Sequence, residues 1–338
     1  MSDRKILTNQ FLNQSGWGNA TQSHLAGDAS NRSYLRLTRN HTGETAVLMD
    51  APPKTGEDIQ PFVAITTHLM SLDLSPPRIL AQDEQHGFLL IEDLGDALFA
   101  WLVDDNPDME RTLYRAAVDV LIQLHQHPAP DGLLDYTPAV MAEYIGPVFE
   151  WYHPATPDEV AAITAEMETV LTKYCTAPPV VMALRDYHAE NLLWLPDRIG
   201  TKCVGLLDYQ DAVIAHPSYD LVSLLEDARR DVSAKLQTEM IDRYTSATGS
   251  DPQTFHAAYC ANGAQRNLRI LGIFARLCMI AGKPDYIDLI PRVWGHLKQD
   301  LSHPALANLN RLVFAALPEP TPNVLQRLKS KCTNPPTP

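Results

Sequence analysis

The chain has 338 residues, of which 45% are hydrophobic and 20% charged, so it contains enough apolar material for a folded core. Its net charge of −14 argues against a nucleic-acid partner and disfavours attachment to an anionic membrane, because both require a basic surface. The five cysteines are scattered without a Cys-x-x-Cys pair, so neither a zinc site nor a disulfide framework is expected. The first residues lack the apolar core of a signal peptide, and no apolar run is long enough to cross a bilayer, which predicts a cytoplasmic protein.

The first ninety residues predict a short helix followed by a small antiparallel sheet. Apolar side chains recur on one side of residues 4–17, as in an amphipathic helix. A second helix is expected over residues 58–71, where apolar residues again recur at helical spacing. Apolar runs bounded by turn residues predict four strands, at 34–37, 45–49, 79–81 and 87–91.

Helical patterns dominate the chain after Asp93. They are expected over residues 109–126, 137–151, 157–174, 219–230, 233–247, 253–282, 286–300 and 304–315, and β signals are confined to 180–182, 192–195 and 204–207. The fold class is therefore α+β and bilobal, with chemistry in the cleft between the lobes. The predicted parts are an N-lobe with an antiparallel sheet (1–93), a larger, mostly helical C-lobe (94–317) and a Pro-rich tail (318–338), which is expected to be extended or disordered.

Three polar residues near the later β signals form the strongest chemical pattern. Asp186 and Asn191 have an Asp-x4-Asn spacing, and Asp208 directly follows the apolar run 204–207. A turn at 196–200 returns the chain, so the three residues are expected to meet at the ends of a hairpin. Phosphoryl transfer from ATP requires one carboxylate to accept a hydroxyl proton, and an amide with a second carboxylate to hold Mg²⁺. The pattern predicts Asp186 as the catalytic base, with Asn191 and Asp208 as magnesium ligands.

A polar loop before the first predicted strand is the candidate phosphate-binding loop. Its small residues would let backbone N–H groups approach the phosphates of a nucleotide, and the expected nucleotide-binding residues are Gly27, Ser30, Asn31 and Arg32. The second strand has Met49 where a kinase carries its phosphate-binding lysine. A thioether cannot pair with phosphate oxygens, so either Arg32 or Lys54 substitutes, or the loop backbone and Mg²⁺ suffice.

The segment after the last predicted N-lobe strand is the candidate hinge. Its main chain can bind the adenine edge, with the Glu92 carbonyl and the Leu94 N–H as the expected partners. Asp93-Leu94-Gly95 is also typical of a tight turn between domains. The two interpretations are compatible, because adenine recognition would use only backbone groups.

The catalytic-loop string resembles the aminoglycoside phosphotransferase/choline kinase superfamily, whose loop usually reads His-Gly-Asp-x-His-x-x-Asn. The chain matches at Asp186, His188 and Asn191, but Leu184 replaces the leading histidine that supports the loop backbone in the family. Longer strings are similar to the anomeric N-acetylmuramate/N-acetylglucosamine kinases of bacterial cell-wall recycling, among them Met49-Asp50-Ala51-Pro52-Pro53 and Gln265-Arg266-Asn267-Leu268.

This resemblance implies a protein-kinase-like fold and an enzyme that uses ATP with Mg²⁺. The implied reaction phosphorylates the anomeric hydroxyl of N-acetylmuramate, N-acetylglucosamine or both, giving a sugar 1-phosphate for peptidoglycan recycling and UDP-sugar synthesis. The implied partners are the sugar and ATP, without nucleic acid or membrane. A monomer is expected, because the sequence has no coiled-coil heptads.

Aromatic faces and planar polar side chains are the usual ligands of a sugar. Trp151 is interpreted either as a stacking platform or as a core residue, and the other candidate sugar-binding residues are Glu143, Gln210, Asp211 and Arg266. Arg266 and the adjacent Asn267 could meet the N-acetyl or lactyl group. Asp220 is expected to be structural, either capping the next helix or bracing the catalytic loop.

Two alternative functions are compatible with the sequence. The first is a kinase of another small alcohol or of an aminoglycoside, since a polycationic acceptor would suit an acidic protein. The second is a non-catalytic nucleotide-binding kinase homologue, which the residues at Met49 and Leu184 motivate. Turnover of the two amino sugars, compared with turnover of aminoglycosides, distinguishes these hypotheses.

Overall fold

The structure is a computed structural model that describes residues 3–25, 32–177 and 179–332. The chain forms two compact units, which we call the sheet unit (Met1–Pro130 and Ala189–Asp211) and the helical unit (Asp131–His188 and Ala212–Pro338). The division therefore cuts the predicted catalytic loop between His188 and Ala189.

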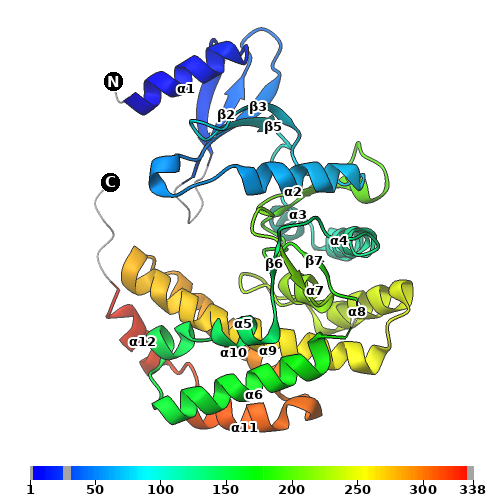
Figure 1. The fold of residues 1–338 in the computed structure, drawn as a ribbon, viewed down its shortest axis with the longest axis vertical. Coiled ribbons are helices and arrows are strands. Elements are labelled where there is room, and N and C mark those ends of the chain that lie inside the picture. Colours follow the sequence, from blue (N-terminus) through cyan, green and yellow to red (C-terminus); the bar gives the residue numbers. More distant parts are fainter. Residues whose placement is uncertain (1–2, 26–31, 178, 333–338) are drawn as a thin grey trace. The chain divides into compact units, whose positions relative to one another are not determined.

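The sheet unit contains an antiparallel sheet that has five strands within the described residues, in the order β1-β2-β3-β5-β4 (Figure 1). The strands are β1 (Thr21–Leu25), β2 (Ser33–Thr38), β3 (Thr45–Asp50), β4 (Ile79–Asp83) and β5 (Phe88–Glu92). Arg36 of β2 pairs with Val47 of β3, which in turn pairs with Ile91 of β5. Because side chains alternate along a strand, these paired residues lie on one face and their neighbours on the other.

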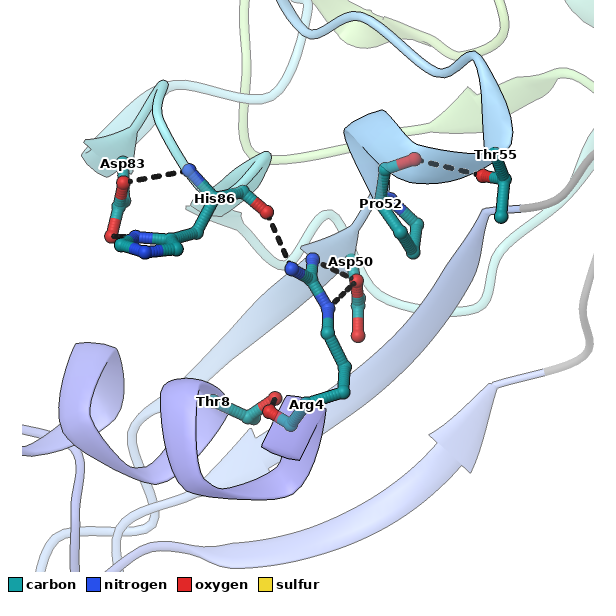
Figure 2. Close-up of polar contacts among 7 residues, drawn as sticks. All are labelled: Arg4, Thr8, Asp50, Pro52, Thr55, Asp83 and His86. Carbon is teal, nitrogen blue, oxygen red and sulfur yellow. Dashed lines mark hydrogen bonds and ion pairs between the residues drawn. The ribbon is translucent and has the colours of Figure 1, made fainter. Parts of the chain in front are cut away.

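One face of the sheet packs against the helix α1 (Asp3–Gln14). The apolar core on this face consists of Phe11, Leu12, Trp17, Leu37, Ala46, Leu48, Phe88 and Leu90. The Phe11 ring stacks on Phe88, with 5.4 Å between centroids. Figure 2 shows a polar contact beside this core: Arg4 pairs with Asp50 at the end of β3 and donates from Nη1 to the His86 carbonyl at 2.6 Å. Apolar packing and this ion pair together hold α1 on the sheet.

A hairpin from much later in the chain also belongs to the sheet unit. In it, β8 (Leu192–Trp194) pairs antiparallel with β9 (Val204–Leu206). The Leu206 N–H donates to the Ser75 carbonyl at 3.0 Å, and the Trp194 N–H donates to the Ala97 carbonyl at 2.8 Å. The remaining α-helices described in this unit are α2 (Gln60–Ser71), α3 (Phe99–Asp105) and α4 (Glu110–Leu124).

The helical unit is organised around the long helix α9 (Pro252–Ala281). The other helices described in it are α5 (Pro138–Glu143), a π-helical turn (Val148–Tyr152), α6 (Pro157–Cys175), α7 (Ser218–Leu225), α8 (Ala234–Thr248), α10 (Tyr286–Leu301), α11 (Ala307–Ala316) and α12 (Pro322–Lys329). A small sheet has the order β6-β10-β7, formed by Leu134–Asp135, Val213–Ala215 and Val181–Ala183. At Gly272 a Cβ would lie 2.2 Å from the Pro147 carbonyl carbon, so only glycine allows α9 to approach the π-helical turn this closely.

The predicted strands and most predicted helices are confirmed, but the structure corrects several details. The helix α3 and the short strands β6 and β10 lie where no element was predicted. The edge strand β1 was not predicted, because its exposed sequence Thr-Gln-Ser-His-Leu lacks apolar alternation. The predicted helix over 137–151 is broken into α5 and the π-helical turn around Pro147, whose ring and missing N–H interrupt a helix. The predicted helix over 219–230 ends at Leu225, and the Arg229 N–H donates to Asp227 Oδ1 at 2.9 Å in a turn.

A further correction concerns the Pro-rich tail. It contains α12, which begins after Thr321 with Pro322 in its first turn, and Leu328 of this helix is 1% exposed. The predicted lobe boundary near Asp93 also differs from the division into compact units, because α3, α4 and the β8–β9 hairpin belong to the sheet unit. Among the described helices, none combines the length and the apolar character that crossing a lipid bilayer requires.

Candidate active site

A cavity of about 500 Å³ lies within the sheet unit. The sheet face opposite α1 contributes Tyr34, Arg36, Val47 and Ile91 to its wall, and the segment 92–96 and part of α3 continue it. The β8–β9 hairpin and the residues that follow contribute Asn191, Asp208 and Gln210. The cavity therefore brings together five residues singled out in the sequence: Glu92, Leu94, Asn191, Asp208 and Gln210.

The hairpin explains why Asn191 and Asp208 lie on the same cavity although seventeen positions separate them. Leu192 pairs with Leu206, and the Leu207 N–H donates to the Asn191 carbonyl at 3.0 Å, so the two polar residues flank the open end of the ladder. Asp208 has a φ of 55°, a left-handed conformation that aspartate adopts more readily than most residues. Gln210 Nε2 donates to Asp208 Oδ1 at 2.7 Å and so orients this carboxylate.

An amide oxygen and a carboxylate fit a hard divalent cation such as Mg²⁺. Among the described residues, no three His, Cys, Asp or Glu side chains lie close enough to hold a metal ion by themselves. This donor set agrees with the usual protein Mg²⁺ site, in which one or two carboxylates share the ion with substrate phosphates and water.

Tyr209 connects the Asp208 backbone to the helix α2. Its ring stacks on Phe62 with 5.1 Å between centroids, and its hydroxyl is 2.7 Å from the hydroxyl of Thr66. Tyr209 is fully buried, and burial raises the pKa of its hydroxyl. Asp208 is thus followed by a residue that is fixed in the core of the same unit, a contact that the sequence did not reveal.

The hinge segment is fixed by ion pairs that sequence reasoning missed. Arg36 Nε lies 2.7 Å from Asp93 Oδ2, and its terminal nitrogens donate to both carboxylate oxygens of Asp96 at 2.8 Å. The carboxylate of Glu92 accepts from Arg198 Nη2 at 2.8 Å, which ties the turn of the β8–β9 hairpin to the end of β5. The alternation of residues 34–37 placed Arg36 opposite the core face, and this was the available sign that it reaches the cavity.

The residues expected near the phosphates are only partly described. Gly27, Ser30 and Asn31 lie outside the described residues. Arg32 is described, and its Nε donates to Glu57 Oε2 at 2.7 Å. Met49 is fully buried in β3, and Lys54 is exposed. The position of the usual lysine is therefore occupied by a buried apolar side chain.

The predicted base Asp186 belongs to the helical unit, where the side chain of Asp220 holds the backbone of its loop. Asp220 Oδ2 accepts from the Leu184 N–H at 2.6 Å, and Asp220 Oδ1 accepts from the Arg185 N–H at 2.9 Å. The Arg185 carbonyl accepts from Ser223 Oγ at 3.0 Å. The predicted bracing role of Asp220 is confirmed, and its carboxylate supports the backbone at the position where Leu184 replaces the usual histidine.

Two features of this brace are unusual: the left-handed backbone of Arg185 and the raised pKa of the Asp220 carboxylate. Arg185 has a φ of 70°, which costs a non-glycine residue roughly 1–2 kcal/mol. Asp220 is fully buried, and burial raises its pKa to about 7 despite the two backbone N–H groups that favour the ionised form. His188 is also buried, which lowers its pKa to about 4, so its imidazole is neutral at pH 7.

The candidate sugar-binding residues occupy different environments. Arg266 is 8% exposed and donates from Nη2 to Ser223 Oγ at 2.8 Å, so it supports the brace from within the helical unit. Asn267 is fully buried and donates to Glu226 and Asp300. Glu143 is exposed at the end of α5, and Trp151 is half-buried in the π-helical turn. Asp211 is exposed at the last position of the sheet unit.

Comparisons of sequence and of structure both relate this chain to phosphotransferases. Residues 21–257 match the model of the phosphotransferase enzyme family. The N-acetylmuramate/N-acetylglucosamine kinase of Caulobacter vibrioides is 39% identical, with 91% of this chain and 95% of that protein covered. The protein of the same name from Pseudomonas putida is 31% identical, with 90% and 92% covered.

Solved structures with low sequence identity share the fold. A choline/ethanolamine kinase family protein from Mesorhizobium loti has a TM-score of 0.63 at 13% identity, with 93% of this chain and 100% of that chain covered. The ADP-bound aminoglycoside phosphotransferase APH(2'')-Ib has a TM-score of 0.60 at 12% identity, with 91% and 99% covered. These similarities confirm the predicted α+β, protein-kinase-like fold. The chain belongs to the phosphotransferase enzyme family.

Proposed function

We propose that this protein is an ATP- and Mg²⁺-dependent kinase that phosphorylates the anomeric hydroxyl of N-acetylmuramate, N-acetylglucosamine or both. The observation that carries the choice of substrate is the 39% identity, over 91% of the chain, to a kinase named for these two sugars. The cavity of the sheet unit supports the choice of donor, because its wall carries a hinge segment at 92–96 together with Asn191 and Asp208.

The sheet unit would bind the donor nucleotide. The Glu92 carbonyl and the Leu94 N–H are the proposed adenine partners, and Arg32 is the described cation nearest the phosphate loop in sequence. Asn191 and Asp208 would hold Mg²⁺, with Gln210 orienting Asp208. The ion, when bound, would neutralise charge on the phosphates.

The helical unit would activate the acceptor. Asp186 accepts the proton of the anomeric hydroxyl as the sugar oxygen forms its bond to the γ-phosphorus and the bond from that phosphorus to the bridging oxygen breaks. The products are the sugar 1-phosphate and ADP. An anomeric hydroxyl is more acidic than an ordinary alcohol, so a carboxylate is a sufficient base when the transferred group is metaphosphate-like. Asp220 acts as a positioning residue through the backbone of Leu184 and Arg185.

An acceptor screen tests the proposal directly. ADP release should accompany loss of the reducing end of N-acetylmuramate or N-acetylglucosamine, and Asp186→Asn should lower kcat by at least 100-fold, in line with the usual contribution of a general base. Asp208→Asn should raise the Mg²⁺ concentration required for half-maximal rate as well as lower kcat. Turnover of aminoglycosides without sugar turnover would establish the alternative acceptor, and the absence of turnover with any acceptor, with nucleotide binding retained, would establish a non-catalytic homologue.

The cellular setting follows from the reactants. A kinase that consumes ATP is expected in the cytoplasm, and a sugar 1-phosphate is the direct precursor of a nucleotide sugar. Peptidoglycan recycling, implied by the family resemblance, would supply such sugars. Measurement of the UDP-sugar pool in cells that lack the gene tests this placement.

A further inference from the structure

A group of rings and guanidinium groups surrounds Tyr136 in the helical unit; we call it the aromatic–arginine cluster and define it as Tyr136, Tyr144, Arg185 and Arg269. The rings of Tyr136 and Tyr144 meet edge to face, with 5.5 Å between centroids. Arg269 Cζ is 5.8 Å from the centroid of Tyr144, and Arg185 Cζ is 5.9 Å from that of Tyr136. The cluster thus runs from α9 to the residue that directly precedes Asp186.

Arg269 lacks the kind of polar partner that other arginines of the helical unit have. Arg266, three residues earlier on α9, is buried and bound to Ser223, and Arg292 pairs with Asp231. Arg269 is half-buried, and within the described residues it has no ion pair and no hydrogen bond from its guanidinium. Its neighbour Tyr144 is 39% exposed, so a ligand can reach both side chains. Within the described part of the chain, the Arg269 guanidinium therefore has no carboxylate partner.

The centre of the cluster is buried but polar. The ring of Tyr136 also meets that of Tyr219 edge to face, with 5.6 Å between centroids. Tyr136 is 4% exposed and Tyr219 fully buried, and no hydrogen bond of normal geometry from the described residues reaches either hydroxyl. Burial raises the pKa of Tyr136, whereas the positive charges of Arg269 and Arg185 act in the opposite direction. Arg185 contacts the Tyr136 ring directly, and Arg269 is connected to it through Tyr144.

We propose that Arg269 binds the carboxylate of an acidic acceptor sugar, with the exposed face of Tyr144 packing against the apolar part of the same substituent. This inference rests on the proposed function, in which the acceptor reacts at Asp186. N-acetylmuramate carries such a carboxylate on its lactyl ether, whereas N-acetylglucosamine has a hydroxyl at that position. A guanidinium group matches a carboxylate in a planar, two-point geometry, which an ammonium or amide group cannot reproduce. Arg269 would therefore determine the preference between the two sugars, and it would make the contact with the lactyl group that the sequence suggested for Arg266.

The test compares Arg269→Gln with the wild type on both sugars. The ratio of kcat/KM for N-acetylmuramate to kcat/KM for N-acetylglucosamine should fall by about tenfold or more, as expected when one charged hydrogen-bonded contact is lost. Arg269→Lys should have a higher ratio than Arg269→Gln, because lysine restores the positive charge but not the planar two-point geometry of the guanidinium group. The matched control is Arg276→Gln, an exposed arginine of the same helix, which should leave the ratio within twofold of the wild type.

A measurement on the wild type alone gives an independent readout. Raising the ionic strength should increase KM for N-acetylmuramate and not KM for N-acetylglucosamine, because salt screens a partly exposed charge pair. A sugar ratio within twofold of the wild type in Arg269→Gln, or equal salt dependence for the two sugars, would overturn the assignment of Arg269 and leave the proposed function intact. Wild-type protein that phosphorylates neither sugar would overturn the proposed function and this inference together.

Discussion

The brace beneath the catalytic loop predicts a specific defect in the variant Asp220→Asn. Asparagine keeps one oxygen acceptor but replaces the other with an NH₂ group, which would face a backbone N–H of Leu184 or Arg185. Leaving one buried N–H without an acceptor costs about 1–3 kcal/mol. The left-handed Arg185 backbone then also loses one of the contacts that hold it.

These costs fall on the loop that carries Asp186, so they should appear mainly in kcat. A penalty of about 1–3 kcal/mol corresponds to a decrease of roughly 5- to 150-fold. KM for ATP should change less than threefold, because the residues that line the cavity all belong to the sheet unit. Steady-state kinetics with varied ATP and varied sugar measures both quantities, and Asp242→Asn, at an exposed aspartate of the helical unit, is the matched control. The reasoning is refuted if Asp220→Asn retains kcat within twofold of the wild type.

The same carboxylate gives a prediction for stability against pH. Its pKa is about 7 in the folded protein and close to 3.8 in the unfolded chain, so its contribution to stability is fully present below pH 3.8 and is lost as the pH rises through 7. Between these values the free energy of unfolding of the wild type, relative to Asp220→Asn, should decrease by at most about 1.4 kcal/mol per pH unit. Thermal unfolding of both proteins at several pH values between 4 and 8 measures the trend, and a constant difference would contradict it.

Two further predictions concern buried contacts. Tyr209→Phe removes the hydrogen bond to Thr66, so it should lower the free energy of unfolding by about 1–2 kcal/mol and raise the Mg²⁺ concentration that the enzyme requires. Adding Thr66→Val should recover most of the lost stability. Simple additivity of the two effects would contradict the pairing. Gly272→Ala should destabilise the protein by about 1–3 kcal/mol or more, because the new Cβ would collide with the backbone at Pro147; Gly295→Ala, at a helical glycine with open space around it, should instead raise the melting temperature slightly.

Patterns local to a few residues predicted much of the fold. The alternation around Arg36 and the buried run at 45–49 defined strands that the structure confirms. The spacing from Asn191 to Asp208 was interpretable because the two antiparallel strands of a hairpin bring the residues at their outer ends together. The helix α12 could also have been found, since Thr321 followed by Pro322 is a common start of a helix.

Features that depend on distant packing could not be predicted. No local pattern shows that the β8–β9 hairpin bonds to Ser75 and Ala97 and so joins the sheet unit. The pairing of Arg36 with Asp93 and Asp96 spans about sixty residues, and charge alone does not select these partners. The burial of Arg266 is equally non-local, because an arginine on a helix is usually expected to be at the surface. In each case the missing information was which parts of the chain lie beside each other.

The passage of the chain between the two compact units, at His188 and Ala189, has an evolutionary consequence. Substitutions that alter the proposed sugar contacts of α9 need not disturb the amino acids that would coordinate magnesium and the nucleotide. A lineage could therefore acquire a new acceptor through substitutions in the helical unit while its binding site for the donor nucleotide stays unchanged. The acceptor alcohol could then diversify while the donor nucleotide stays the same.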